Sequence, residues 1–359
     1  MSRIVGYLDA RTDRELIGWI ANLDHPGRLE TVICNGEDGR QLAFRPFIPR
    51  RDVCDAFNVT GRFGFAIPLA ALSEFGGGVV RLTDSLGATL PQGGAIAVDA
   101  GAGGRPLGPA WVVLHIQKTA GTSLRAALTA HARPCETLFL YPDGFTGLSP
   151  DELGNLPQAQ RAALRLVIGH VPFGIADLLP GRADYVTFLR DPAARLESHY
   201  LHHLAIDAGP DLTGSSRVAA TVTGGLSDEF DNLMVRMIAG VGVDTVPLGT
   251  VSEAEVERAL HHIRTRFRFV GLTERLTAHY RVLAGLMGLS ADVPPVENTC
   301  RVADRATALA QVDWHQVMHR NRFDAMLYRR VQEEGLCGRD LGAIPHLVRT
   351  GKGRRVKGR

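Results

Sequence analysis

The sequence has few cysteines, and their spacing excludes the common cysteine-based frameworks. Five cysteines stand among 359 residues. Their number is odd, none forms a CxxC pair, and none lies at a spacing typical of a zinc finger. We therefore expect reduced and mostly buried thiols rather than a disulfide scaffold or a structural zinc site.

Long hydrophobic runs are also lacking. No uninterrupted apolar stretch approaches the roughly 18 residues of a membrane-spanning helix. The initial stretch MSRIVGYLDARTDRE carries acidic residues where a signal peptide would have an apolar core. We expect a soluble, cytoplasmic protein without a transmembrane segment. The sequence does not indicate an oligomeric state.

An excess of charge of one sign is missing as well. The formal net charge is +2, and the final stretch GKGRRVKGR alone supplies five basic residues without an acid. No broad basic surface is expected on the folded part, which argues against a nucleic acid partner. We predict that residues 346–359 form a basic, disordered tail.

The composition is that of a globular protein, and two regions of the chain differ in their hydrophobic pattern. Hydrophobic residues make up 45% of the chain, and its length suffices for two folded units. Residues 1–95 show short stretches of period two around turns: ETVIC and QLAFR flank NGEDGR, and VVRLTD and ATLPQ flank SLG. This pattern predicts a small, sandwich-like all-β accessory domain, followed by a glycine-rich linker over residues 96–110.

From residue 111 the pattern changes to strand, loop and helix. Four apolar runs predict strands: WVVLHI (111–116), RLVIGH (165–170), DYVTFLR (184–190) and FRFVGL (267–272). Helical patterns lie between them, and a capping box of Ser252 and Glu255 marks the start of one helix. Strands that alternate with helices predict an α/β fold over residues 111–345, with a parallel sheet flanked by helices on both faces.

The loop in HIQKTAGTSL, residues 115–124, has the composition of a phosphate-binding loop between the first strand and a helix. The N–H groups at the start of a helix favour an anion, a glycine permits close approach, and a lysine adds positive charge. The residues that we place in this candidate anion site are Lys118, Thr119, Ala120, Gly121, Thr122 and Ser123.

The order of residues in this loop differs from that of nucleoside-triphosphate loops. In GxxxxGK[ST] the lysine follows the last glycine, and the next hydroxyl binds magnesium. Here Lys118 precedes Gly121, and we find no convincing aspartate at the end of an apolar strand to serve as a second magnesium ligand. We therefore expect a phosphate-bearing ligand that binds without a metal ion.

A second stretch, FLRDPAARLESHY, residues 188–200, is suited to bind another phosphate. Asp191 is a natural N-cap and Pro192 a natural first helical residue, so a helix is predicted to start there. Ser198 then lies roughly 20° from the face of Asp191 and about 10 Å along the helix axis. A long Arg190 side chain can converge with Ser198 on one phosphate.

Together these two stretches resemble the sulfotransferase family, particularly the branch containing the heparan and uronyl 2-O-sulfotransferases. Further matching stretches, in order, are IGHVPFG, DNLMVRMIAG, FVGLTERL and NRFDAMLYRR, so the resemblance covers about residues 111–335. The loop departs from the family pattern at Gln117 and Ala120, where the family has proline and glycine. The resemblance implies a P-loop-type fold in which Arg190 and Ser198 bind the 3′-phosphate of the donor, 3′-phosphoadenosine 5′-phosphosulfate (PAPS).

The resemblance also implies a reaction. The sulfuryl group of PAPS would pass to a hydroxyl of a carbohydrate or glycoconjugate acceptor and leave adenosine 3′,5′-bisphosphate. His170 matches the segment that carries the family's catalytic base, and imidazole titrates near neutral pH. Lys118 is expected to stabilise the leaving phosphate. A satisfied core histidine and an exposed loop lysine are the structural alternatives for these two residues.

Two other functions remain open at this stage. A P-loop kinase or nucleotide hydrolase with an altered loop would bind ATP with magnesium, and a non-catalytic glycan-binding protein could retain the sulfotransferase fold. Residues 1–95 look like the small β-domain that sometimes precedes glycan-modifying enzymes in bacteria, which suggests an accessory carbohydrate-binding or interaction module.

Three histidines in SHYLHH, namely His199, His202 and His203, raise the question of a metal site. They fall on one predicted helix. Because no carboxylate or cysteine in the sequence pattern completes a ligand set, we expect them to be packed or solvated rather than to bind a metal.

Overall fold

A computed structural model describes residues 3–99, 109–130, 132–141, 147–207, 215–290 and 305–343. The predicted tail, residues 346–359, lies outside the described residues. The chain divides into two compact units, one formed by Met1–Val113 with Leu128–Ala183 and the other by Leu114–Ala127 with Asp184–Arg359. These units divide the chain differently from the predicted domains, because residues 128–183 belong with the N-terminal region.

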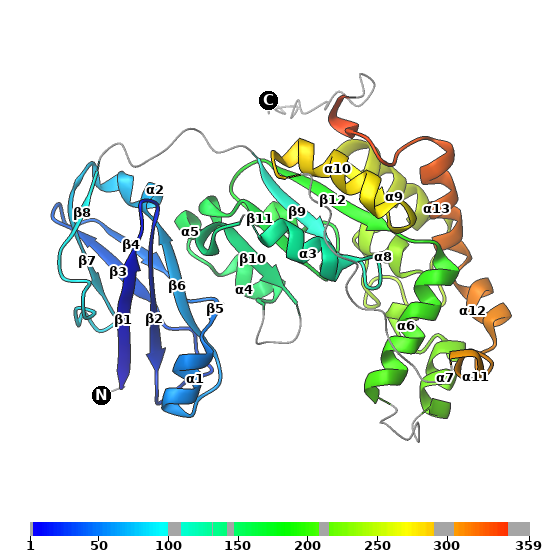
Figure 1. The fold of residues 1–359 in the computed structure, drawn as a ribbon, viewed down its shortest axis with the longest axis horizontal. Coiled ribbons are helices and arrows are strands. Elements are labelled where there is room, and N and C mark those ends of the chain that lie inside the picture. Colours follow the sequence, from blue (N-terminus) through cyan, green and yellow to red (C-terminus); the bar gives the residue numbers. More distant parts are fainter. Residues whose placement is uncertain are drawn as a thin grey trace, which may run out of the picture. The chain divides into compact units, whose positions relative to one another are not determined.

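Two four-stranded antiparallel sheets form the N-terminal part of the first unit (Figure 1), as the period-two pattern predicts. One sheet has the order β1-β2-β6-β5 and the other the order β4-β3-β7-β8. The strands are β1 (Ile4–Arg11), β2 (Glu15–Asn22), β3 (Val32–Gly36), β4 (Gln41–Phe44), β5 (Ile48–Pro49), β6 (Arg62–Pro68), β7 (Gly78–Thr83) and β8 (Ile96–Val98). Ile20 and Phe65 from one sheet and Val80 and Leu82 from the other share one buried apolar core, which makes the pair of sheets a sandwich.

Both predicted hairpins bring their two stretches together, the second over fewer residues. β3 pairs with β4 in antiparallel register, with Val32 opposite Phe44. At the end of β7, Thr83 forms an isolated bridge with Thr89, and Leu82 accepts a hydrogen bond from the N–H of Leu90 at 2.9 Å, whereas the start of β7 pairs with β8. β8 therefore adds residues 96–98, which were predicted as linker, to the sandwich. The linker residues 100–108 lie outside the described part of the chain.

Within the first unit, the sandwich packs against short helices of the α/β region. These are η2 (Pro134–Glu136), α4 (Pro150–Gly154) and α5 (Gln158–Ala163). The buried side chain of Gln160 exchanges two hydrogen bonds with the backbone of Arg45, at 2.9 and 2.8 Å. Arg62 of β6 pairs with Glu152 of α4. Buried polar pairs of this kind fix the register of the two surfaces, because an unpaired buried group would be unfavourable.

A five-stranded parallel sheet flanked by helices forms the α/β region, with the order β10-β11-β9-β12-β13. Its strands are β9 (Ala110–Leu114), β10 (Thr137–Leu140), β11 (Leu166–Gly169), β12 (Ala183–Leu189) and β13 (Phe267–Leu272). The four predicted strands are present, and β10 adds one that the sequence pattern did not reveal. β10 and β11 lie on one side of β9, and the later strands β12 and β13 lie on the other side. The strand order therefore reverses beside β9. In parallel sheets, ligands bind beyond the carboxyl ends of the strands at such a point.

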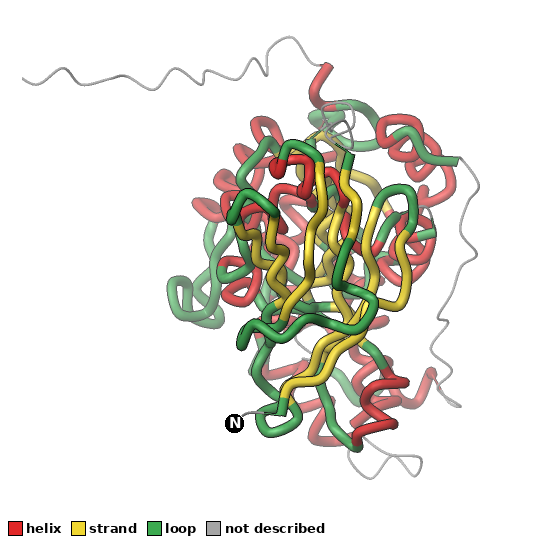
Figure 2. Tube along the Cα trace, turned by 90° about the vertical axis from the view of Figure 1, so that its left-hand side faces the viewer, coloured by secondary structure: helices red, strands yellow, loops and turns green. Residues whose placement is uncertain are grey.

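The second unit is largely helical, as the labelled helices α6 to α13 in Figure 1 show, and Figure 2 colours the helices of the chain red and the strands yellow. Its elements include α3 (Gly121–Thr129, which extends into the first unit), α6 (Pro192–Asp207), α7 (Ser215–Gly224), η4 (Asp228–Phe230), α8 (Leu233–Ala239), α9 (Glu253–Arg266), η5 (Thr273–Arg275), α10 (Leu276–Met287), α11 (Arg305–Leu309), α12 (Trp314–Arg320) and α13 (Arg322–Glu333). The predicted capping box of Ser252 and Glu255 is present at the start of α9. None of the described helices is both long and apolar enough to cross a bilayer.

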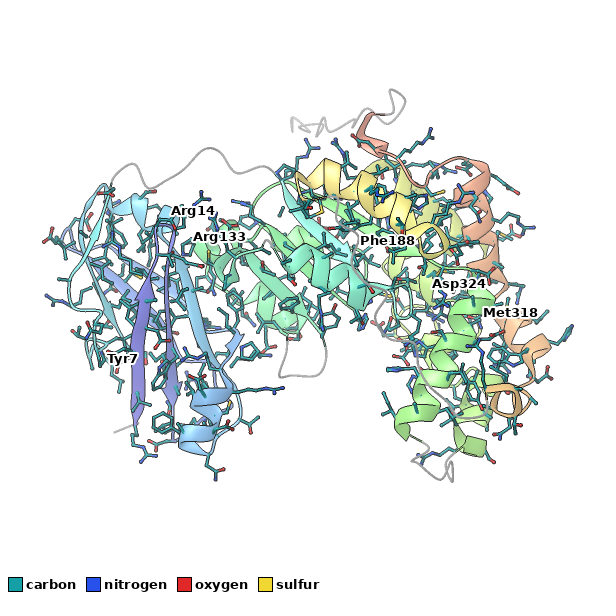
Figure 3. All side chains as sticks on the ribbon, viewed as in Figure 1. Tyr7, Arg14, Arg133, Phe188, Met318 and Asp324 are labelled. Carbon is teal, nitrogen blue, oxygen red and sulfur yellow. The ribbon has the colours of Figure 1, made fainter. Side chains whose placement is uncertain are left out.

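A buried carboxylate joins three of these helices. Asp324 of α13 (Figure 3) is fully buried and accepts hydrogen bonds from the N–H groups of Val235 and Met234 at the start of α8, at 2.9 and 3.3 Å. Its other neighbour is the fully buried guanidinium of Arg195 on α6, with Nη2 and Oδ2 3.8 Å apart. One side chain thus caps α8 and balances a buried charge on α6.

Two asparagines reinforce this junction. Asn232, with φ of +51°, donates its N–H to Oδ1 of Asn321 at 2.8 Å. In return, Oδ1 of Asn232 accepts from the N–H groups of Phe323 and Asp324 at 3.1 and 3.2 Å. The stretches DNLMVRMIAG and NRFDAMLYRR are therefore joined by reciprocal hydrogen bonds, and these residues hold helices together.

We expect Asp324→Asn to destabilise the protein by about 3 kcal/mol, because it leaves the charge of Arg195 buried without its carboxylate. Urea unfolding followed by circular dichroism measures the change. Asp244→Asn, at an exposed position, is the matched control and should change stability by less than about 0.5 kcal/mol. Equal stability of the two variants would refute a charge-balancing role for Asp324.

Candidate phosphate-binding site

The loop between β9 and α3 contains two residues in the left-handed region. Lys118 has φ of +67° and Ala120 has φ of +64°. For residues with a side chain this backbone conformation costs roughly 1–2 kcal/mol each. Left-handed residues in compact loops turn successive N–H groups toward one point, as in anion-binding nests. Ala120, where the resembling family has glycine, thus keeps a glycine-like conformation at an energetic cost.

Side chains on both sides hold this loop in place. The buried hydroxyl of Thr119 donates to the carbonyl of Ile116 at 2.8 Å. Nη1 of Arg190 donates to the carbonyl of Lys118 at 3.0 Å. The second hydrogen bond joins the two predicted phosphate motifs directly, since Arg190 follows β12 and Lys118 follows β9.

The glycine of the loop is required by a histidine. A Cβ atom on Gly121 would lie 1.5 Å from Nε2 of His115, so no other residue fits while the imidazole occupies that place. His115 is half-buried and packs across the start of α3. The glycine was predicted to let a ligand approach, and the structure adds a steric reason for it within the chain itself.

Two threonines fix the strand ends from which the loop and Arg190 extend. The fully buried Thr187 of β12 donates its hydroxyl to the carbonyl of Leu114, at 2.8 Å, where β9 ends. Thr273 of η5 donates to the carbonyl of Leu189 at 3.0 Å. These two residues were not predicted to contribute to the site. Their sequence signal, a hydroxyl within or just after an apolar run, is too common to identify them.

The guanidinium of Arg190 is partly buried. Burial lowers the pKa of its guanidinium below the ordinary value, and the nearby Glu274 opposes that shift. An arginine nevertheless stays protonated in proteins. Among the described residues its hydrogen bond goes to a carbonyl and none goes to a carboxylate. The site therefore holds a fixed positive charge that can accept an anion.

The start of α6 is capped as predicted. Oδ1 of Asp191 accepts from the N–H of Ala194 at 3.0 Å, as expected of an N-cap. The N–H of Asp191 itself donates to Glu274 at 2.7 Å, and Glu274 also accepts from the hydroxyl of Tyr328 at 3.0 Å. The FVGLTERL stretch thus supplies a carboxylate that fixes the backbone directly after Arg190.

The structure brings two of the predicted site residues into direct contact, and the convergence of the others stays a prediction. The loop residues 118–123, Arg190 and Ser198 belong to the second unit. Lys118 and Arg190 are in direct contact, whereas Ser198 lies half-buried on α6, and its convergence with Arg190 on one phosphate stays a prediction.

His170 belongs to the first unit and directly follows β11. Its N–H donates to the carbonyl of Leu140 at 3.0 Å, and its half-buried imidazole packs edge-to-face on Tyr141, with ring centroids 4.8 Å apart. The imidazole therefore has an aromatic neighbour that the sequence did not predict. Its role as a base stays a prediction.

The premise of one expectation about the histidines of α6 is wrong, while the expectation that they bind no metal is not tested by this finding. Glu229 of η4 places Oε2 within 3.0 Å of Nε2 of His199 and 2.9 Å of Nε2 of His203, so a carboxylate does complete this set. The sequence could not indicate this partner, because it comes from a different element that only the tertiary structure brings to α6.

Comparisons of the sequence with family models and curated proteins assign no function to these residues. No family model matches the chain, and no curated protein matches its sequence. What the site does is therefore inferred from its own geometry.

We expect Ala120→Gly to stabilise the protein by up to about 1 kcal/mol. Glycine relieves the left-handed strain, and the greater freedom of the unfolded chain offsets part of the gain. Thermal and urea unfolding measure the change. The control is Ala126→Gly at an exposed helical position of α3, which should destabilise by about 1 kcal/mol. If both variants lose stability equally, the loop does not require a left-handed residue at 120.

Proposed function

We propose that the protein is a PAPS-dependent sulfotransferase that acts on a hydroxyl of a carbohydrate or glycoconjugate. The observation that carries the proposal is the hydrogen bond from Arg190 to the carbonyl of Lys118. It fixes a positive charge beside a strained loop at the start of α3, where the strand order reverses. Such a place suits an anionic ligand with more than one phosphate.

The residues favour a donor with phosphates at both ends of a nucleoside. The loop residues 118–123 would bind the 5′-phosphate at the start of α3, and Arg190 with Ser198 would bind the 3′-phosphate. Arg305 of α11 lies near Arg190, where it forms an ion pair with Glu197 at 2.9 Å. Positive charge at the end of β12 suits phosphate oxygens and disfavours a divalent ion at the same place.

In the proposed reaction, the acceptor hydroxyl attacks sulfur as its proton passes to His170. The bond between sulfur and the bridging oxygen breaks, and the electron pair stays on the 5′-phosphate of adenosine 3′,5′-bisphosphate. Lys118 stabilises the negative charge on that oxygen. His170 suits the role of base because it follows a strand of the parallel sheet at its carboxyl end, and because imidazole titrates near neutral pH.

Nucleotide binding tests the donor. By calorimetry we expect adenosine 3′,5′-bisphosphate to bind without a metal and more tightly than adenosine 5′-diphosphate with magnesium. Arg190→Ala should weaken binding of the bisphosphate by roughly 10- to 100-fold, since hydrogen bonds to charged groups contribute about 1.5–3 kcal/mol. The same variant should weaken binding of adenosine 5′-diphosphate less, because that nucleotide has no 3′-phosphate for Arg190 to bind.

The control is Arg258→Ala on the exposed face of α9, which should bind both nucleotides normally. A preference for the magnesium complex over the bisphosphate would contradict the proposal and favour a kinase or nucleotide hydrolase.

Sulfate transfer from labelled PAPS to a panel of glycans tests the base. We expect His170→Ala to lower the rate by about 10²- to 10⁴-fold while it leaves bisphosphate binding unchanged. His261→Ala, at an exposed position of α9, should transfer normally. An unaltered rate in His170→Ala would remove His170 as the base. Donor binding by the unchanged protein without transfer to any glycan would favour a non-catalytic glycan-binding protein.

A further inference from the structure

Three polar side chains converge on one point beside α6, apart from the loop. His199 and His203 lie four residues apart on this helix and therefore on the same face. Their Nε2 atoms are 2.9 Å from each other. Oε2 of Glu229, from η4, is 3.0 Å from Nε2 of His199 and 2.9 Å from Nε2 of His203. The three atoms form a nearly equilateral triangle.

Hydrogen bonds alone do not satisfy all three atoms of this triangle. A neutral imidazole carries one N–H and one lone pair, and an ionised carboxylate only accepts. If both Nε2 atoms carry protons toward Glu229, two donors face each other at 2.9 Å. If only one Nε2 carries a proton, the bare Nε2 and the carboxylate both compete for that proton, and no proton lies between these two acceptors. In either case one side of the triangle lacks a good hydrogen bond.

A metal ion satisfies all three atoms at once. Divalent first-row metals bind imidazole nitrogen and carboxylate oxygen at roughly 2.0–2.2 Å. Three neighbouring corners of an octahedron with bonds of about 2.1 Å lie about 3.0 Å apart, whereas the corners of a tetrahedron with similar bonds lie about 3.4 Å apart. The observed separations of 2.9, 3.0 and 2.9 Å correspond to one face of an octahedron.

The side chains are of the kinds that bind such ions. A neutral imidazole offers one nitrogen lone pair, and an ionised carboxylate offers acceptor oxygens. Arg195 carries a fixed positive charge close to this set, since its Nη2 donates to the backbone carbonyl of Glu229 at 3.1 Å, and Asp324 balances that charge.

The surroundings combine an apolar wall with an open side. Phe230 packs edge-to-face on His199, with ring centroids 4.9 Å apart, and also contacts His203 at 5.7 Å. The side chain of His199 is 3% exposed, while His203 and Glu229 are 32% and 30% exposed. An ion held here would be anchored on a buried ligand and would keep its remaining coordination positions toward solvent.

We propose that His199, His203 and Glu229 form a binding site for a divalent first-row metal ion that accepts six ligands, for which Co²⁺ and Zn²⁺ serve as probes. The ligand atoms are Nε2, Nε2 and Oε2, on one face of a six-coordinate ion whose other ligands are water or an oxygen-bearing molecule. The ion ties η4 to α6 across the stretch that contains α7. The proposed sulfuryl transfer uses other residues, Arg190 before α6 and Ser198, which directly precedes His199 on that helix.

The test uses the full chain after removal of metal with a chelator. Calorimetric titration with Zn²⁺ should give one site per chain and a higher unfolding temperature. Co²⁺ in the same site should give the weak visible bands of a six-coordinate ion. Glu229→Gln and His203→Ala should each weaken Zn²⁺ binding at least about tenfold, since even groups that only orient ligands change metal affinity by 10- to 100-fold.

Two exposed neighbours provide matched controls. His202→Ala and Asp228→Asn remove the same kinds of group one residue away from the site and should bind Zn²⁺ as the unchanged protein does. Unfolding of the metal-free variants shows that each is folded. Equal Zn²⁺ affinity in Glu229→Gln, His203→Ala and the controls would overturn the proposal, as would no binding to the unchanged protein. Binding of adenosine 3′,5′-bisphosphate, measured without metal, tests the proposed function separately, so either proposal can fail while the other holds.

Discussion

The buried ion pair between Asp324 and Arg195 is the constraint on which the arrangement of the second unit depends. Each charge would be strongly unfavourable alone, because no water reaches it. The carboxylate also caps α8, so one residue of α13 determines where α6 and α8 can lie. The position of α6 depends on this pair, and with it the positions of Ser198, of the adjacent His199 and of His203 one turn further on.

A second constraint acts at the carboxyl ends of the strands. The loop before α3 holds two non-glycine residues in the left-handed region, and this strain is offset by hydrogen bonds from Thr119 and Arg190. Strain of this kind tends to occur at functional sites, where the surrounding structure determines the backbone. Arg190 both stabilises the loop and offers positive charge to a ligand, so the fold and the proposed donor site share the same hydrogen bond.

The stretches that resemble sulfotransferases fall into two physical classes. HIQKTAGTSL and FLRDPAARLESHY meet at the loop and have the charges that a phosphate needs. DNLMVRMIAG and NRFDAMLYRR meet elsewhere, through the reciprocal hydrogen bonds of Asn232 and Asn321. Their residues serve to join helices. A pattern in a sequence can thus mark a folding constraint as readily as a site, and only the contacts distinguish the two.

The sequence by itself determined the local structure: the period-two strands, the capped starts of α6 and α9, the parallel strands and the loop between β9 and α3. These follow from short-range patterns of apolar residues, caps and glycines, which act within a few residues. It also located the groups that carry charge at the loop, including Lys118 and Arg190. It did not reveal β10, it missed that β7 pairs with β8, and it missed Glu229 as the partner of His199 and His203. Those contacts join residues that are far apart in the chain, and the packing of whole elements decides them. The tertiary structure alone therefore determined that Ala120 must adopt a glycine-like conformation, that Gly121 makes room for His115, and that a carboxylate completes the histidine set on α6.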